Sequence, residues 1–301
     1  MKLLLSITLL ICSLSAAAQK ELPFQLPIVP ETIEGLQPRS DFYIEHFWDF
    51  CDLKKSFSAR DKMADAFDMY IELMPYASAE VVQKSIGAFM KKLEKQPMDQ
   101  IFIGELAEGR MYSDTATIAS DELYLWFIEP IVANKRVDKD YKLRFQHQAQ
   151  SLRRSQAGMT APEFTYTGLD GQKHTFAADS TRIGTILFFN DPDCTECSMA
   201  RLRLDADVQT TRQIETGRID FYSIYPGEAD QEWLTQAMGY PKIWQVGAAP
   251  EIDEIYDIRT SPCFYVLNPQ GKILIKTASP NVIIDIMSKL APPRRRKAAN
   301  Q

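Results

Sequence analysis

Two cysteines, Cys194 and Cys197, stand two residues apart where an apolar run gives way to a helical pattern. The run 185–189 has the length and composition of a strand that is buried on both faces. A thiol at the first turn of a helix faces unpaired N–H groups and the positive end of the helix dipole, which stabilise its thiolate. We therefore expect Cys194 to attack disulfides and Cys197, one turn deeper, to resolve the mixed disulfide.

The same spacing also fits a metal site or a structural disulfide. Zinc would need two further ligands, and only Cys263 and His174 stand nearby in this half of the chain. A copper site would need both thiols and a well-placed histidine, for which His174, on an expected hairpin, is the candidate. A disulfide across two residues closes a very small loop and gains little chain entropy. The pattern favours redox chemistry without a metal or cofactor, while the structural disulfide stays open.

A proline at the start of an otherwise good strand is the second chemical signal. Pro262 precedes the apolar run 263–267, and a proline there breaks the ladder unless the chain turns sharply. A cis Ser261–Pro262 bond would make that turn, although only about 5–6% of X–Pro bonds are cis. We expect a cis bond here.

The elements that must position these residues follow Gly158. Strands are expected at 163–167, 185–189, 219–225, 263–267 and 272–276, and helices at 201–217, 230–238, 250–256 and 280–290. Strand and helix alternate before a final hairpin and helix, which predicts an α/β domain with a mixed central sheet over residues 157–291.

The preceding region has a different periodicity. Apolar residues recur at helical spacing from 41 to 156, for example at Met63, Phe67 and Ile71, in about six segments. This predicts an all-α helical domain over 41–156. Residues 19–40 carry four prolines and are expected to form an extended lead-in. The fold class is thus a two-domain α+β chain, all-α first and α/β second.

The two ends of the chain differ in composition from the domains between them. Residues 1–18 combine Lys2, a short apolar run and three alanines, as secretory signal peptides do. Cys12 could mark a lipid anchor, but Ile11 precedes it where such sites carry a small residue, so anchoring is not expected. No later segment approaches the roughly 20 apolar residues of a membrane helix. The basic tail 292–301 is expected to be a disordered terminus.

The second half resembles the thioredoxin fold, and more closely the extracytoplasmic thiol–disulfide proteins of the TlpA/ResA type. The resemblance covers about residues 158–290. It rests on five stretches in order, at 158–164, 170–171, 193–197, 260–262 and 268–271. The helical half resembles an uncharacterised domain that accompanies such modules in bacterial envelope proteins.

The resemblance implies roles for particular residues. In the family the cis proline lies against the cysteine pair, and the residue before it offers backbone hydrogen bonds to an extended substrate. Ser261 and Pro262 occupy these substrate-binding positions, beside Cys194 and Cys197 as the catalytic pair.

This chain departs from the family at the acids that accept the proton of the second cysteine. Phe188 and Ala200 stand where thioredoxin and the ResA type carry a buried acid. Asp191, Asp193 and Glu196 could substitute, but three acids near the site also disfavour a thiolate through like-charge repulsion. We expect weaker stabilisation of the Cys194 thiolate than in a strong oxidant.

Two further cysteines have separate predictions. Cys51 stands on the apolar stripe of an expected helix, which predicts a buried small hydrophobic residue. Cys263 is expected to pack within its strand. A Cys51–Cys263 bridge between the domains remains open.

The function predicted from these features is an extracytoplasmic thiol–disulfide oxidoreductase of the periplasm, reducing or isomerising. Its partners would be protein thiol or disulfide clients and an electron-donor protein. The formal net charge of −6 argues against a nucleic-acid partner. The alternative is a non-catalytic envelope protein that uses both domains as a docking platform.

Overall fold

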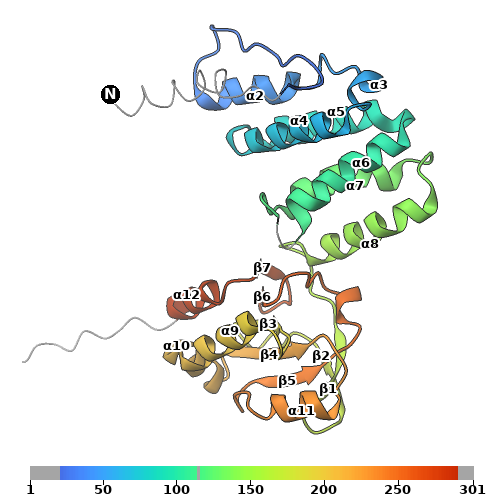
Figure 1. Ribbon diagram of the computed structural model, residues 1–301. Helices are drawn as coiled ribbons and strands as arrows, with labels where there is room; N and C mark the ends of the chain where they lie inside the picture. Colours follow the sequence, from blue (N-terminus) through green and yellow to red (C-terminus); the bar gives the residue numbers. More distant parts are fainter. Residues whose placement is uncertain (1–20, 114–115, 291–301) are drawn as a thin grey trace, which may run out of the picture. The chain divides into compact units, whose positions relative to one another are not determined.

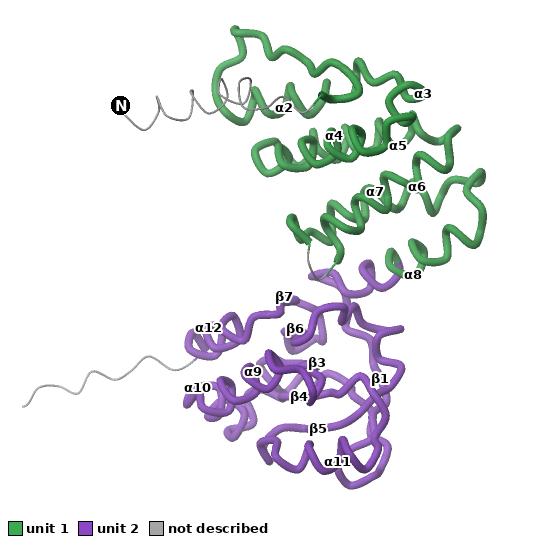
Figure 2. Tube along the Cα trace, viewed as in Figure 1, with its two compact units in different colours: residues 1–149 green, residues 150–301 purple. Residues whose placement is uncertain are grey.

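The computed structural model describes residues 21–113 and 116–290 (Figure 1). The chain divides into two compact units, residues 1–149 and 150–301 (Figure 2). The expected signal peptide, Cys12 and the basic tail 292–301 lie outside the described residues. The domain boundary at 156/157 stays a prediction. Within the described ranges, no helix is long and apolar enough to cross a membrane.

The first unit is helical, as the periodicity predicts. Its α-helices are α2 (Leu36–His46), α3 (Leu53–Ser56), α4 (Arg60–Leu73), α5 (Ala79–Lys92), α6 (Pro97–Ala107), α7 (Asp121–Ala133) and α8 (Lys139–Ser155), the last of which runs on into the second unit. Two short 3₁₀ helices, η1 (Met74–Tyr76) and η2 (Leu93–Lys95), continue α4 and α5, respectively. A π-helical segment, η3 (Glu108–Tyr112), continues α6. Helix α2 starts at Leu36, inside the expected lead-in. Pro38 is tolerated there because the first turn of a helix does not use the backbone N–H that proline lacks.

Aromatic packing forms the core of this unit. Trp48 stacks on Phe89 with ring centroids 3.8 Å apart, which joins the chain after α2 to α5. The buried Tyr70 hydroxyl donates to Ser85 Oγ at 2.8 Å, and Ser85 in turn donates to the Ile44 carbonyl at 2.7 Å. This chain of hydrogen bonds pairs polar groups that burial would otherwise penalise.

The second unit contains a mixed sheet, as predicted. Its strands are β1 (Phe164–Gly168), β2 (Lys173–Phe176), β3 (Gly184–Phe189), β4 (Ile219–Tyr225), β5 (Gln245–Ala248), β6 (Cys263–Leu267) and β7 (Ile273–Thr277). They are ordered β2-β1-β5-β4-β3-β6-β7. The β3–β4 and β4–β5 pairs are parallel and the other pairs antiparallel.

The helices of this unit are α9 (Thr195–Ala206), α10 (Val208–Glu215), α11 (Gln231–Ala237) and α12 (Pro280–Leu290). Helices α9, α10 and α12 pack together (Figure 1). The prediction of a single helix at 201–217 was wrong, because the helix is interrupted at Asp207. The Asp207 carboxylate accepts the Thr210 N–H at 2.7 Å and caps the start of α10. The helix expected at 250–256 is only the turn η4 (Ile252–Glu254).

Strand β3 is buried along its whole length, which explains its continuous apolar run. Ile186 and Phe188 pack with residues of α9 and α12 on one face. Leu187 and Phe189 pack with Tyr256 and other residues on the opposite face. The two cores fix the strand, and therefore fix where its carboxyl end delivers the cysteine loop.

Candidate functional site

The cysteine pair lies directly after the carboxyl end of β3. Asn190, 3% exposed, holds the loop that leads to it. Its Nδ2 donates to the Phe188 carbonyl at 3.1 Å and to Ser223 Oγ at 2.8 Å. Its Oδ1 accepts the Tyr240 hydroxyl at 2.7 Å. This amide joins β3, β4 and the chain after α11, so it fixes the starting point of α9.

Cys194 is the N-cap residue of α9. Its Sγ accepts the backbone N–H of Cys197 at 3.1 Å and lies 3.7 Å from the Ser261 carbonyl oxygen. The residue is partly exposed. The sulfur thus occupies the place where serine or aspartate usually satisfies a helix N-terminus.

Cys197 lies one turn along the helix and is 2% exposed. Its Sγ is 3.0 Å from Ser261 Oγ. Burial raises the pKa of the Cys197 thiol to about 12, the hydrogen bond with Cys194 adds to the rise, and the hydrogen bond with Ser261 opposes it. Cys197 is therefore protonated in the reduced structure, with its sulfur out of reach of a large partner.

The Ser261–Pro262 peptide bond is cis, as expected. Ser261 is exposed and Pro262 is buried. The structure therefore brings together the four residues selected from the sequence, through Ser261 and its contacts with both sulfurs. Their catalytic and substrate-binding roles remain a proposal.

A buried acid anchors the loop that carries Ser261. Asp257 is 3% exposed, and its carboxylate pairs with Arg259 at 2.6 Å and with Lys276. Its backbone N–H donates to Ser155 Oγ at 3.1 Å, and its carbonyl accepts the Tyr265 hydroxyl at 2.7 Å. Both ends of this short loop, at Asp257 and at strand β6, are thus tied to the core.

Acidic side chains gather at the carboxyl ends of β3 and β4. Asp191 Oδ1 accepts the N–H of Asp193 at 2.9 Å, and the Asp193 carboxylate accepts Gln236 Nε2 at 3.3 Å. Burial raises the pKa of Tyr225, at the end of β4, and the Asp191 carboxylate adds to that rise. The acids are therefore close to the site, as expected, and lend it a negative field.

Cys51 and Cys263 are free thiols. Cys263 is fully buried in β6, and burial raises its pKa to about 12, in agreement with a packing role. Cys51 follows α2 in a loop and is partly exposed, because the helix ends at His46. The prediction of a buried residue on a helical stripe was therefore wrong for Cys51.

His174 lies on β2, where its Nε2 is 3.0 Å from Asp170 Oδ1. Across the described ranges, no three or more His, Cys, Asp and Glu side chains are grouped so that they could hold a metal ion. The copper and zinc alternatives thus find no ligand set among these residues.

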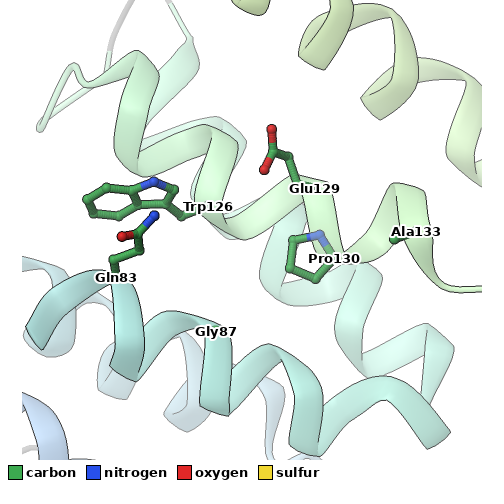
Figure 3. Close-up of a pocket in the computed structure, with 6 residues that line it drawn as sticks. All are labelled: Gln83, Gly87, Trp126, Glu129, Pro130 and Ala133. Atoms are coloured by element: carbon green, nitrogen blue, oxygen red, sulfur yellow. The ribbon is translucent and has the colours of Figure 1, made fainter. Parts of the chain in front are cut away.

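The helical unit carries an open groove of about 350 Å³ between α5 and α7 (Figure 3). It is lined by Gln83, Gly87, Trp126, Glu129, Pro130 and Ala133. Gly87 leaves room there, since a Cβ atom at this position would meet no atom within 4 Å. The groove belongs to the first unit, and the cysteine pair belongs to the second.

Sequence reasoning missed three contributions to the site. It assigned only backbone contacts to Ser261, whereas the side-chain hydroxyl reaches Cys197. It also passed over Asn190 and Tyr240. A polar residue directly after a buried strand could have drawn attention to Asn190, but nothing in the sequence pairs it with a tyrosine fifty residues later.

Comparisons with known proteins agree with this architecture. Residues 7–155 match a family described as "Domain of unknown function (DUF5106)". The chain is similar to the crystal structure of a thioredoxin-like protein from Bacteroides caccae, with 22% identity and a TM-score of 0.72, over 89% of this chain and 99% of that one. The second unit therefore has a thioredoxin-like fold, as the resemblance implied.

Two shorter structures match about half of the chain. A conserved protein of unknown function from Bacteroides fragilis has 33% identity and a TM-score of 0.41, over 44% of this chain and 99% of that one. A thiol-disulfide oxidoreductase from the same species has 22% identity and a TM-score of 0.38, over 44% and 99%. No match was found among the curated proteins.

Proposed function

We propose that this thioredoxin-like chain is an extracytoplasmic thiol–disulfide oxidoreductase, with Cys194 as nucleophile and Cys197 as resolving thiol. One observation carries the proposal: the partly exposed Cys194 sulfur caps α9 beside the carbonyl oxygen of Ser261. A helix N-terminus stabilises a thiolate, and the thiolate is the attacking species.

The reaction proceeds in two exchanges. The Cys194 thiolate attacks one sulfur of a client disulfide, forms a mixed disulfide and releases the other client sulfur as a thiolate. That thiolate takes up a proton, and Cys197 loses one. The Cys197 thiolate then attacks Cys194 Sγ, which forms the Cys194–Cys197 disulfide and releases the second client sulfur as a thiolate that takes up a proton from the solvent. A dithiol protein returns the pair to the reduced state by the reverse exchange.

The substrate-binding proposal places an extended client segment along Ser261 and Pro262. Ser261 is exposed beside the Cys194 sulfur, so a client cysteine can approach while its backbone follows the loop. Reduction or isomerisation of protein disulfides is the direction implied by the resemblance. The signal-like residues 1–18 support a periplasmic address, where protein disulfides persist.

The test is reduction of insulin by the chain without residues 1–18, with a small dithiol as electron source. Wild type and Cys51→Ser, the matched control, should accelerate reduction. Cys194→Ser should fall to the uncatalysed rate, and Cys197→Ser, incubated with insulin in the absence of the dithiol, should hold the client as a mixed disulfide that mass spectrometry detects. Equal background rates for all four proteins would contradict the proposal.

A docking protein without catalysis is the second candidate. The observation that favours it is the open groove between α5 and α7 in the first unit, whereas Cys194 and Cys197 lie in the second (Figure 3). In cells, Cys194→Ala would then trap no partner yet retain function, whereas an oxidoreductase would lose function.

A further inference from the structure

We propose that the Ser261 hydroxyl is a positioning residue for the resolving step, by donating a hydrogen bond to the Cys197 thiolate as it forms. This inference rests on the proposed function. It gives Ser261 a side-chain role in addition to the backbone role in client binding.

The geometry is specific to the two side chains. Ser261 Oγ lies 3.0 Å from Cys197 Sγ, although the residues are 64 positions apart. In the reduced pair either atom can donate, because each carries a proton. Once Cys197 ionises, its sulfur has no proton left, so the hydroxyl must be the donor. The contact therefore becomes a charge-assisted hydrogen bond in the state that attacks.

Burial makes hydrogen-bond donors to this sulfur important, and the Ser261 hydroxyl and, to a lesser degree, the Asp191 backbone both lower the pKa of the Cys197 thiol. Cys197 is 2% exposed and packs with Phe188 and Ala200, neither of which can donate a hydrogen bond or accept a proton. Desolvation raises the pKa of its thiol, and the Ser261 hydrogen bond is among the influences that lower it. The hydroxyl thus offsets part of the free-energy cost of ionising the buried Cys197 thiol, which an apolar neighbour would not reduce.

Ser261 also connects the buried sulfur to water. The residue is exposed, whereas Cys197 is not. A proton that leaves Cys197 can pass to the solvent past this hydroxyl, while the Cys194 sulfur contacts only the backbone carbonyl of the same residue. Removal of the hydroxyl should therefore slow the second exchange more than the first.

The two exchanges can be timed separately with an aromatic disulfide whose thiolate product is coloured, such as 5,5′-dithiobis(2-nitrobenzoate). Attack by Cys194 releases one coloured thiolate, and attack by Cys197 on the mixed disulfide releases the second. The full chain without residues 1–18, in a Cys51→Ser background, limits the signal to the pair, because Cys263 is fully buried.

Ser261→Ala should slow the second phase about tenfold or more relative to its own first phase, since a hydrogen bond to a charged group has that effect. The pH at which the second phase is half-maximal should rise by about one unit. Ser261→Thr, which keeps a hydroxyl, should restore both. Thr260→Val is the matched control, because the Thr260 hydroxyl bonds to Cys263 on the same loop.

Each failure has its own signature. A second phase in Ser261→Ala with the rate and pH profile of wild type would overturn the role of Ser261 and leave the proposed function intact. Ser261→Thr as slow as Ser261→Ala would also overturn it, by showing that shape and not the hydroxyl matters. Absence of the first phase in wild type would overturn both the proposed function and this role.

Discussion

The backbone N–H of Cys197 donates a hydrogen bond to the Cys194 sulfur at 3.1 Å. The second cysteine thus holds the first in place, since the cap of α9 closes over the Cys-x-x-Cys turn. An N-cap interaction normally stabilises a helix by about 1 kcal/mol. Here the same interaction also fixes the position of the Cys194 sulfur, which lies 3.7 Å from the Ser261 carbonyl oxygen, so the structure of the helix and the proposed chemistry of the site depend on one contact.

The strand that delivers the cysteine loop tolerates no side chain at its first residue. A Cβ atom on Gly184 would lie 2.7 Å from the Leu267 carbonyl oxygen, which belongs to the neighbouring strand β6. Gly184→Ala should therefore lower the free energy of unfolding by about 1–3 kcal/mol, as overpacking does. Urea denaturation measures the change.

Gly87 is the matched control for this substitution. It lies in the interior of α5, where an added Cβ meets no atom within 4 Å. Gly87→Ala should raise the free energy of unfolding by up to about 1 kcal/mol through helix propensity. If Gly184→Ala kept or raised the free energy of unfolding, as Gly87→Ala should, the close approach of β3 and β6 at Gly184 would be contradicted.

The buried carboxylate of Asp257 should matter more to stability than any exposed ion pair. Its two partners, Arg259 and Lys276, are themselves mostly buried. Asp257→Asn removes the negative charge and leaves both cations facing a neutral amide, at a cost of about 3 kcal/mol. Glu45→Gln, which breaks the exposed pair with Lys84, is the control and should have little effect. Similar losses in both variants, measured by urea denaturation, would argue against the Asp257 cluster.

Cys263 should make the protein less stable in alkali. Its pKa is raised from 9.0 to about 12 by burial. Its contribution is therefore fully present below pH 9.0 and is lost as the pH rises toward 12, because the unfolded chain releases a proton that the native chain retains. The slope approaches about 1.36 kcal/mol per pH unit for one proton.

Comparison of wild type with Cys263→Val isolates this share of the pH dependence. Cys197 and the buried tyrosines contribute equally to both proteins. The variant should lose stability less steeply above pH 9.0, whatever its stability at neutral pH. Equal slopes in urea titrations at several alkaline pH values would show that the Cys263 thiol ionises freely.

Much of this fold could be predicted because its signals are local. The apolar run of β3, the cysteine pair and the proline before β6 each predict their element from a few neighbouring residues. Strands β4 and β6 and helix α12 start and end where their patterns do. Strand β5 was missed, since it has four residues and its pairing, with β1 and with β4, is set by distant chain. Strand β2 was expected only as the second arm of the hairpin that carries His174.

The site could be predicted only in part, because some of its contacts join residues that are far apart in the sequence. Cys194 and Cys197 are sequence neighbours, so their spacing is visible. The contact of Ser261 Oγ with Cys197 Sγ and that of Tyr240 with Asn190 join residues 64 and 50 positions apart. Such contacts follow from the packing of the whole sheet. The interruption at Asp207 was missed because an aspartate inside a helical pattern can either continue the helix or cap a new one, and the pattern does not distinguish the two.

The central claim is that Cys194 and Cys197 form a reversible dithiol–disulfide pair. Equilibration of the chain without residues 1–18 in glutathione buffers of graded potential, followed by acid quenching and peptide mass spectrometry, measures it directly. The account predicts one two-electron transition that joins Cys194 to Cys197, while Cys263 stays a thiol throughout. If Cys194 and Cys197 instead carried glutathione separately or stayed reduced across the whole range, the account would be contradicted.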